Sequence, residues 1–167
     1  MNQKDVKFYD DDPEWPYSFK VDLWGKQKEV QVEVLDLDID DSFLDLIFPI
    51  IKEKISFINE QRFEIEKALI EDDTVQLAND WAESAESVED EDNCYIMEDG
   101  QKVYLPITEE DFKKNIYIDE AEIMVEDSLD NVSIHFFIKY NPDIFAGHAL
   151  ELYIDKDNKI ECIGLAG

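Results

Sequence analysis

Apolar residues occupy alternate positions in two segments near the N-terminus of the chain. In residues 19–23 and again in residues 30–34, every second residue is apolar and the residues between them are polar. A period of two is typical of a strand with one buried face. Gly25 and Lys26 lie between the two segments and supply the chemistry of a tight turn. The pattern predicts an N-terminal β-hairpin.

The middle of the chain changes to helical spacing. From Phe43 to Ile58, apolar residues recur at intervals of three and four, which predicts an amphipathic helix. Pro49 falls inside this stretch and predicts a kink or a break, because proline lacks the backbone N–H that a helix interior needs. Two further helices are expected at about 61–70 and 74–85.

The last third of the chain is rich in β-branched and aromatic residues at strand spacing. Thr108 and the acidic residues after it predict the start of a short helix that ends near Lys114. A tight turn is expected at 155–159. Strands are expected at 116–125, 132–140, 149–154 and 160–165.

The order of these elements predicts the fold class. Strands, then helices, then strands favour an α+β fold with an N-terminal β-hairpin, a helical middle and a C-terminal antiparallel β-sheet. The chain has 167 residues, of which 44% are hydrophobic, and this is enough to build one core. We therefore expect a single α+β domain over residues 1–167.

The net charge changes the picture of what such a domain binds. The chain holds 43 Asp and Glu against 15 Lys and Arg, which gives a formal net charge of −28. Such a charge repels phosphates and argues against nucleic acid and anionic membranes as partners. Solubility of a small domain needs only about 2–8 units of net charge. The excess charge destabilises a compact fold by self-repulsion. We therefore expect the electric field of these charges to have a function, namely the fast capture of a basic protein.

The acidic residues are densest between the helical middle and the C-terminal strands. Residues 68–101 contain twelve Asp and Glu and no Lys or Arg, and residues 86–93 are expected to form a mobile acidic loop. We expect a partner to contact this region through carboxylates and two aromatic anchors, although packing within the helical layer is the simpler alternative for Trp81. The candidate partner-binding residues are Asp80, Trp81, Glu83, Glu86, Glu89, Asp90, Glu91, Asp92 and Tyr95.

The N-terminal segment, the apolar stretches and the cysteines indicate in which cellular compartment the protein is found. No apolar segment of the secretory type follows Met1, and the longest apolar stretch, at 43–51, is too short to span a bilayer. Cys94 and Cys162 lie far apart and form no paired motif. These features predict a cytoplasmic protein with reduced thiols and no contact with a membrane.

Catalytic chemistry has few candidates in this sequence. The two histidines, His135 and His148, belong to neighbouring expected strands, but a metal site needs a third ligand and the sequence does not fix their register. The chain also lacks a GxSxG nucleophile motif and a glycine-rich phosphate loop. We therefore expect no metal, no cofactor and no enzymatic activity. The alternative is an enzyme or a metal-dependent protein that uses His135 and His148.

Asp155, Asp157 and Asn158 have a spacing similar to the start of a calcium loop. A complete EF-hand loop needs glycine at its sixth position and glutamate at its twelfth. Ile160 and Ala166 stand at those positions here. The missing residues favour an ordinary β-turn.

Several segments of the C-terminal part form a recognisable set. They are the helix start at 107–112, the strand at 134–137, the segment 143–150 and the glycine-rich end at 163–167, and their most specific element is an aromatic-x-Gly-His motif made by Phe145, Gly147 and His148. Over residues 108–167 the chain resembles an uncharacterised family of bacterial domains of unknown function.

This resemblance implies a role but carries over no catalytic residues. Small acidic bacterial domains of this kind often act as immunity proteins beside secreted toxins. Together with the charge, the resemblance leads us to expect an immunity protein that covers the active cleft of a cognate toxin, a basic nuclease being one candidate. Gly147 would serve a bulge or a close strand approach, and His148 a hydrogen bond that fixes it.

Overall fold

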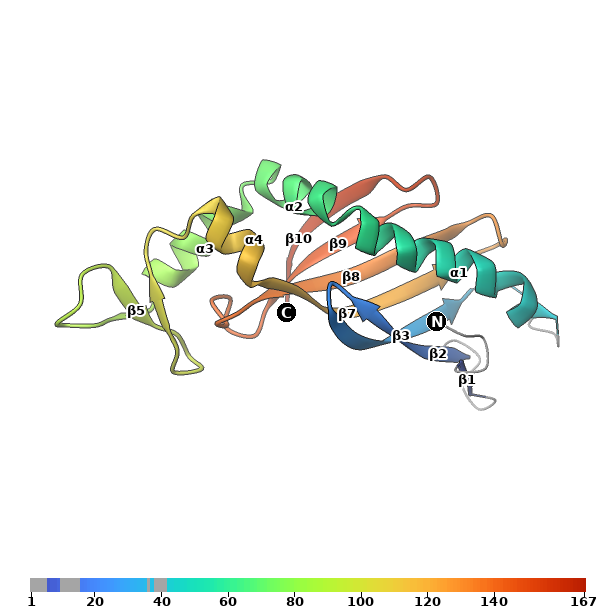
Figure 1. The fold of residues 1–167 in the computed structure, drawn as a ribbon, viewed down its shortest axis with the longest axis horizontal. Coiled ribbons are helices and arrows are strands. Elements are labelled where there is room, and N and C mark those ends of the chain that lie inside the picture. Colours follow the sequence, from blue (N-terminus) through green and yellow to red (C-terminus); the bar gives the residue numbers. More distant parts are fainter. Residues whose placement is uncertain (1–5, 10–15, 36, 38–41) are drawn as a thin grey trace.

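A seven-stranded sheet forms the body of the protein in the computed structural model, which describes residues 6–9, 16–35, 37 and 42–167 (Figure 1). The strand order across this sheet is β1-β2-β3-β7-β8-β9-β10. The strands are β1 (Lys7–Phe8), β2 (Tyr17–Leu23), β3 (Lys26–Val34), β7 (Ile116–Val125), β8 (Val132–Tyr140), β9 (Ala149–Ile154) and β10 (Ile160–Ala166). The N-terminal hairpin and the C-terminal antiparallel strands predicted from the sequence are both confirmed, within an α+β fold.

One parallel pairing joins these two parts into a single sheet. β3 lies parallel to β7, with Gln31 opposite Glu122 and Val34 opposite Val125. The sequence pattern does not reveal this pairing, because alternation identifies a strand but not its neighbour. Parallel neighbours need a crossover connection, and here the whole helical middle of the chain provides it.

The described residues of this crossover form four helices: α1 (Phe43–Glu60), α2 (Arg62–Glu71), α3 (Thr74–Glu83) and α4 (Glu109–Asn115). α1 and α2 lie along one face of the main sheet (Figure 1). The inward side of α1 carries Ile47, Ile51 and Ile58, which are all fully buried. Pro49 is exposed and does not break this helix, which contradicts a break at that residue. No helix among the described residues is long and apolar enough to cross a membrane.

A second, three-stranded sheet lies at one end of the molecule beside α3 (Figure 1). Its strands are β4 (Glu86–Ser87), β5 (Cys94–Ile96) and β6 (Lys102–Tyr104), in that order. The first two residues of the expected acidic loop therefore belong to a strand. Residues 88–93 connect β4 to β5.

The main sheet sorts its side chains between two faces. On the helix side, the buried residues of β7 and β8 include Ile123, Ile134 and Phe136, which belong to one continuous hydrophobic core. We call the opposite side the outer face, and its described residues are largely polar and exposed or half-buried. They include Glu29, Gln31, Glu33, Glu120, Glu122, His135 and Glu151. The alternation that predicted the strands thus also predicts which face is acidic.

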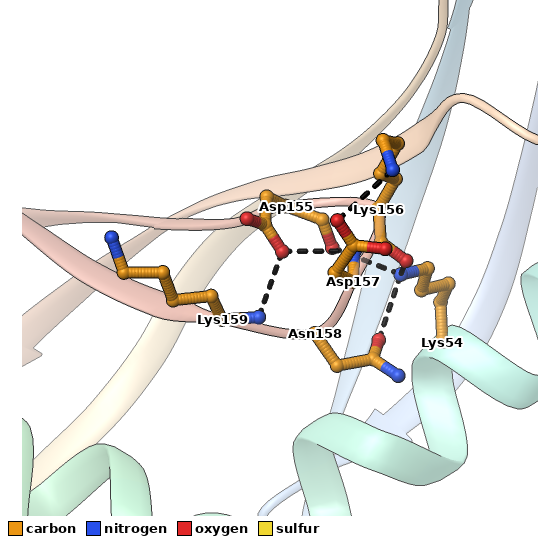
Figure 2. Close-up of polar contacts among 6 residues, drawn as sticks. All are labelled: Lys54, Asp155, Lys156, Asp157, Asn158 and Lys159. Carbon is orange, nitrogen blue, oxygen red and sulfur yellow. Dashed lines mark hydrogen bonds and ion pairs between the residues drawn. The ribbon is translucent and has the colours of Figure 1, made fainter.

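A buried lysine ties α1 to the turn between β9 and β10 (Figure 2). Lys54 is only 6% exposed. Its Nζ donates hydrogen bonds to the backbone oxygen of Asp155 at 3.1 Å, to that of Lys156 at 3.3 Å and to Oδ1 of Asn158 at 2.7 Å. Burial lowers the pKa of this ammonium from its ordinary value, although nearby acids, Asp155 first, favour the charged form.

The predicted β-turn at this point is confirmed. Oδ1 of Asp155 accepts hydrogen bonds from the backbone N–H groups of Asp157 and Lys159, at 2.9 and 2.8 Å. Asn158 has a φ of 64°, a conformation that asparagine tolerates well. The turn oxygens of the calcium-like segment bind an internal ammonium group, that of Lys54.

Replacing Lys54 tests how strongly this contact holds α1 to the sheet. Lys54→Met keeps the length of the buried chain but removes the donor, so three acceptors each lose one hydrogen bond; the backbone oxygen of Asp155 keeps the bond from the N–H of Asn158. We expect the free energy of unfolding to fall by about 1–3 kcal/mol, the range for buried groups that lose a charged hydrogen-bond partner. Urea denaturation measures this change.

Lys52→Met is the matched control, because Lys52 lies on the same helix and is exposed. Its effect should stay within about 0.5 kcal/mol. Equal effects of the two substitutions would contradict the role given to Lys54.

Candidate functional site

A cleft of about 410 Å³ opens where α3, the small sheet and the loop between β8 and β9 meet. Its apolar lining includes Trp81, Ile96, Met97 and Ile144. Met97 and Ile144 are buried, whereas Ile96 is 36% exposed. Three carboxylates also line the cleft, those of Glu86, Glu98 and Asp143. The cleft therefore combines an apolar floor with an acidic rim.

Trp81 connects the helix to the motif of the β8–β9 loop. Its ring contacts Phe145 edge-on, with ring centroids 6.0 Å apart, and contacts His148 in the same way at 5.4 Å. Phe145 is fully buried and Trp81 is half-buried. The structure thus brings together a predicted partner-binding residue and two residues of the aromatic-x-Gly-His motif. Trp81 packs inside the molecule and still presents part of its surface to the cleft.

Gly147 serves the turn before β9. Its φ is +89°, a conformation that favours glycine, and a Cβ atom there would contact nothing within 4 Å. Its backbone N–H donates to Oδ2 of Asp143 at 2.8 Å, and the N–H of His148 donates to the backbone oxygen of Phe145 at 3.0 Å. The expected close strand approach at Gly147 is therefore wrong; the turn conformation requires glycine. The tight contact lies at Gly167, where a Cβ would come within 2.2 Å of Nδ1 of His148.

Two polar side chains, those of Asn79 and Asp99, position the small sheet against the rest of the molecule. The side chain of Asn79, on α3, accepts from the N–H of Ile107 at 2.8 Å and donates to its carbonyl at 3.0 Å. Oδ2 of Asp99, beyond β5, accepts from the N–H of Asp143 at 3.1 Å. These contacts fix the two sides of the cleft relative to each other.

The predicted acidic contact residues do not all lie at this cleft. Among them, only Trp81 and Glu86 line it. Asp80 is exposed and accepts a hydrogen bond from Gln76 at 2.7 Å. The remaining members, apart from Glu91 and Tyr95, are exposed on α3 or on the connection from β4 to β5. These are Glu83, Glu89, Asp90 and Asp92.

Glu91 is paired within the molecule. Its carboxylate accepts a hydrogen bond from Tyr104 at 2.6 Å and forms an ion pair with Lys102. These two donors, Lys102 first, lower the pKa of Glu91 to about 2. The same hydrogen bond raises the pKa of Tyr104 to about 12. Glu91 therefore holds the β4–β5 connection to β6.

Several cleft residues were missed from the sequence. Tyr95 was expected as an anchor, but it is half-buried and packs against the core, whereas its neighbour Ile96 lines the cleft. Successive residues of a strand point to opposite sides, so an error of one position exchanges the two. Glu98 lies in the acidic stretch but was not chosen as a contact residue, and Asp143 belongs to the segment 143–150, which was noted only for the family resemblance.

The two histidines lie far apart. His135 faces Tyr153, and the last pair of β8 and β9 is Ile138 with Leu150, three residues or roughly 10 Å further along the strands. His148 lies beyond that pair, before β9 begins. The structure therefore does not bring the two residues of the alternative enzyme site together.

His135 lies between two carboxylates on the outer face. Its Nε2 is 2.7 Å from Oε1 of Glu151, and its Nδ1 is 3.7 Å from Oε2 of Glu122. The carboxylates approach opposite nitrogens of the ring, so one metal ion could not be bound by the ring and both acids together. Among the described residues, no group of three or more His, Cys, Asp or Glu is placed to hold a metal ion.

The cysteines offer little nucleophilic reactivity. Cys94 is buried and Cys162 is half-buried. Burial first, and the negative charge of Asp72 second, raise the pKa of the Cys162 thiol to about 11. At neutral pH this group is almost wholly protonated, and the thiolate is the reactive form.

Comparison with known proteins gives one result. Residues 7–165 match a protein family described as "Uncharacterized protein conserved in bacteria (DUF2262)". The match extends well beyond the C-terminal segment that carried the resemblance seen in the sequence. Searches of curated proteins and of solved structures return no match.

The contacts of Glu91 predict an unusual titration. Its carboxylate should titrate near pH 2, against an ordinary value of 4.5. Because the folded-state pKa is the lower one, the contact contributes stability above pH 4.5 and loses it as the pH falls through about 2. Carboxyl NMR measures the midpoint directly.

Variants separate the two donors. Lys102→Met or Tyr104→Phe should move the midpoint of Glu91 up towards 4.5, the former more strongly because Lys102 is the larger cause. Lys67→Met, an exposed lysine on α2, should leave it unchanged. A Glu91 midpoint near 4.5 in the unmodified protein would refute the pairing.

Proposed function

The chain belongs to the DUF2262 family of bacterial proteins, and from this premise we propose that it is an acidic protein-binding module. The cleft beside Trp81 is its docking site, and the partner is a basic protein. Within this class, we propose that it is an immunity protein that neutralises a cognate bacterial toxin.

The observation that carries this proposal is the composition of the cleft. An apolar floor provides contact area that excludes water, and an acidic rim provides complementary charge for Lys and Arg. Ile96 and Trp81 offer the partly exposed apolar surface, and Glu86 and Glu98 lie at its border. A partner segment with an apolar side chain flanked by basic residues fits this arrangement.

The charge of the whole chain supports the same class of partner. A net charge of −28 produces a field that attracts cations from a distance and accelerates their encounter. α3 and the small sheet lie at the same end of the molecule (Figure 1). The exposed acids of α3 and of the β4–β5 connection therefore belong to the elements that also line the cleft. These acids would raise the association rate of a basic toxin, whereas the contacts buried in the complex would set its dissociation rate.

The test begins with a partner recovered from the native bacterium and identified by mass spectrometry. Stopped-flow measurements then give association rates over a salt series. We expect the on-rate to fall steeply as salt rises, because exposed charges are screened beyond about 8–10 Å at physiological ionic strength. The off-rate should change less.

Two pairs of substitutions then locate the docking site. Glu86→Gln with Glu98→Gln removes two charges from the cleft rim and should lower the on-rate at low salt by about 3–10-fold. Glu53→Gln with Glu60→Gln removes the same charge from exposed positions of α1 and is the matched control. Equal effects of the two pairs would show a non-specific field and contradict docking at the cleft. An on-rate that changes neither with salt concentration nor with these Glu→Gln substitutions would contradict the whole proposal.

A further inference from the structure

β10 forms an edge of the main sheet. In the part of the chain that the structure describes, it pairs with β9 and with no other strand. An edge strand presents backbone N–H and C=O groups that another strand can bind. β10 also contains a single charged residue, Glu161, in a chain of which 35% is charged. Charged residues or proline usually protect natural edge strands against pairing with another strand. β10 contains one charged residue and no proline.

The two sides of this edge differ in chemistry. On the helix side, Ile160 faces Ile154 and Cys162 faces Leu152, so the strand itself is apolar there. Asp72, at the end of α2, is the charged residue that acts on Cys162 from this side. On the outer face, Glu161 lies opposite Tyr153 and Gly164 lies opposite Glu151. A strand added to β10 would therefore meet apolar residues with one side and carboxylates with the other.

The edge has one irregularity. The register shifts between Cys162 and Gly164, which leaves Ile163 as an extra residue that is 53% exposed. Such a bulge limits how far a regular strand can pair. It also presents an exposed apolar side chain at the centre of the edge.

We propose that β10 binds an extended segment of a basic protein as an additional strand of the main sheet. The backbone groups of the edge provide the hydrogen bonds, and the two faces select the side chains. The partner's side chains on the helix side are apolar, and those on the outer face are Lys or Arg, of which one pairs with the exposed Glu161. Glu151 adds negative charge on that face, although its carboxylate already contacts His135. A second copy of the chain is the poorer occupant, because each copy carries a charge of −28. This surface is separate from the cleft.

The probe is a synthetic seven-residue peptide of alternating valine and lysine with blocked termini. Binding is followed by NMR, with amide hydrogen exchange read along β10. We expect exchange of amides in β10 to slow at least about 10-fold at saturation. Two controls separate strand pairing from charge alone: a peptide of the same composition with valines and lysines in separate blocks, and the alternating peptide with N-methylated amides. Each should bind at least about 10-fold more weakly.

A matched pair of variants tests the position on the protein. Ile163→Lys places a charge at the edge and should weaken peptide binding about 5-fold or more. Leu46→Lys is the control, because Leu46 is 54% exposed and Ile163 is 53% exposed, and the charge change is the same. Circular dichroism confirms that both variants are folded.

The outcomes are decisive in both directions. Equal binding of all three peptides, equal effects of the two variants, or no binding of the alternating peptide would overturn the proposal. Dimerisation by sedimentation, with β10 amides protected in the absence of peptide, would assign the edge to a second copy instead. The experiment needs no toxin, so its failure leaves docking at the cleft untouched, and failure of the cleft variants leaves this result untouched.

Discussion

The parallel pairing of β3 with β7 is the constraint on which the rest of the structure depends. It joins an N-terminal hairpin to a C-terminal antiparallel sheet, so that β3 and β7 pair with each other and neither remains an edge strand. Because parallel neighbours need a long connection, all four helices and the small sheet lie in the chain between them. α1 and α2 use this connection to cover one face of the main sheet. α3 and the small sheet lie at one end, and the cleft forms where they meet the β8–β9 loop.

The same arrangement determines which positions of the strands can carry acidic side chains. Burial of one face removes the apolar half of each strand from water and leaves the other half free to be acidic. The few lysines are placed to offset this locally: Asp119 pairs with Lys28 at 2.9 Å and with Lys139 at 3.1 Å. Lys54 is used differently, since it is buried and binds turn oxygens. The chain has 43 Asp and Glu but only 15 Lys and Arg, so its own cations are too few to offset the acids one for one. In the proposed function, a basic partner contributes opposite charge.

Much of the fold follows from periodicity in the sequence. The hairpin, α1, the cap at Thr108 and the four C-terminal strands could all be predicted, because each depends on neighbours in the chain. Thr108 accepts from the N–H of Asp111 at 3.1 Å, as a local cap should. The pairing of β3 with β7 and the site of Lys54 could not be predicted, because they depend on residues far apart in the sequence.

The candidate site was harder to predict for the same reason. Trp81 and the motif at Phe145 and His148 were noticed separately, and only the fold brings their rings together. Glu91 was grouped with the free acids because sequence shows its neighbours but not Tyr104, which lies across the small sheet. Composition identifies the acidic stretch; three-dimensional contacts decide which acids are available to a partner.

Docking of a basic partner at the cleft beside Trp81, as proposed, can be followed by hydrogen exchange of the protein, alone and bound to the partner recovered from the native bacterium. We expect binding to slow exchange at residues 84–98 and 141–147, on the two sides of the cleft. Protection confined to the outer face of the main sheet, with these two segments unchanged, would contradict it.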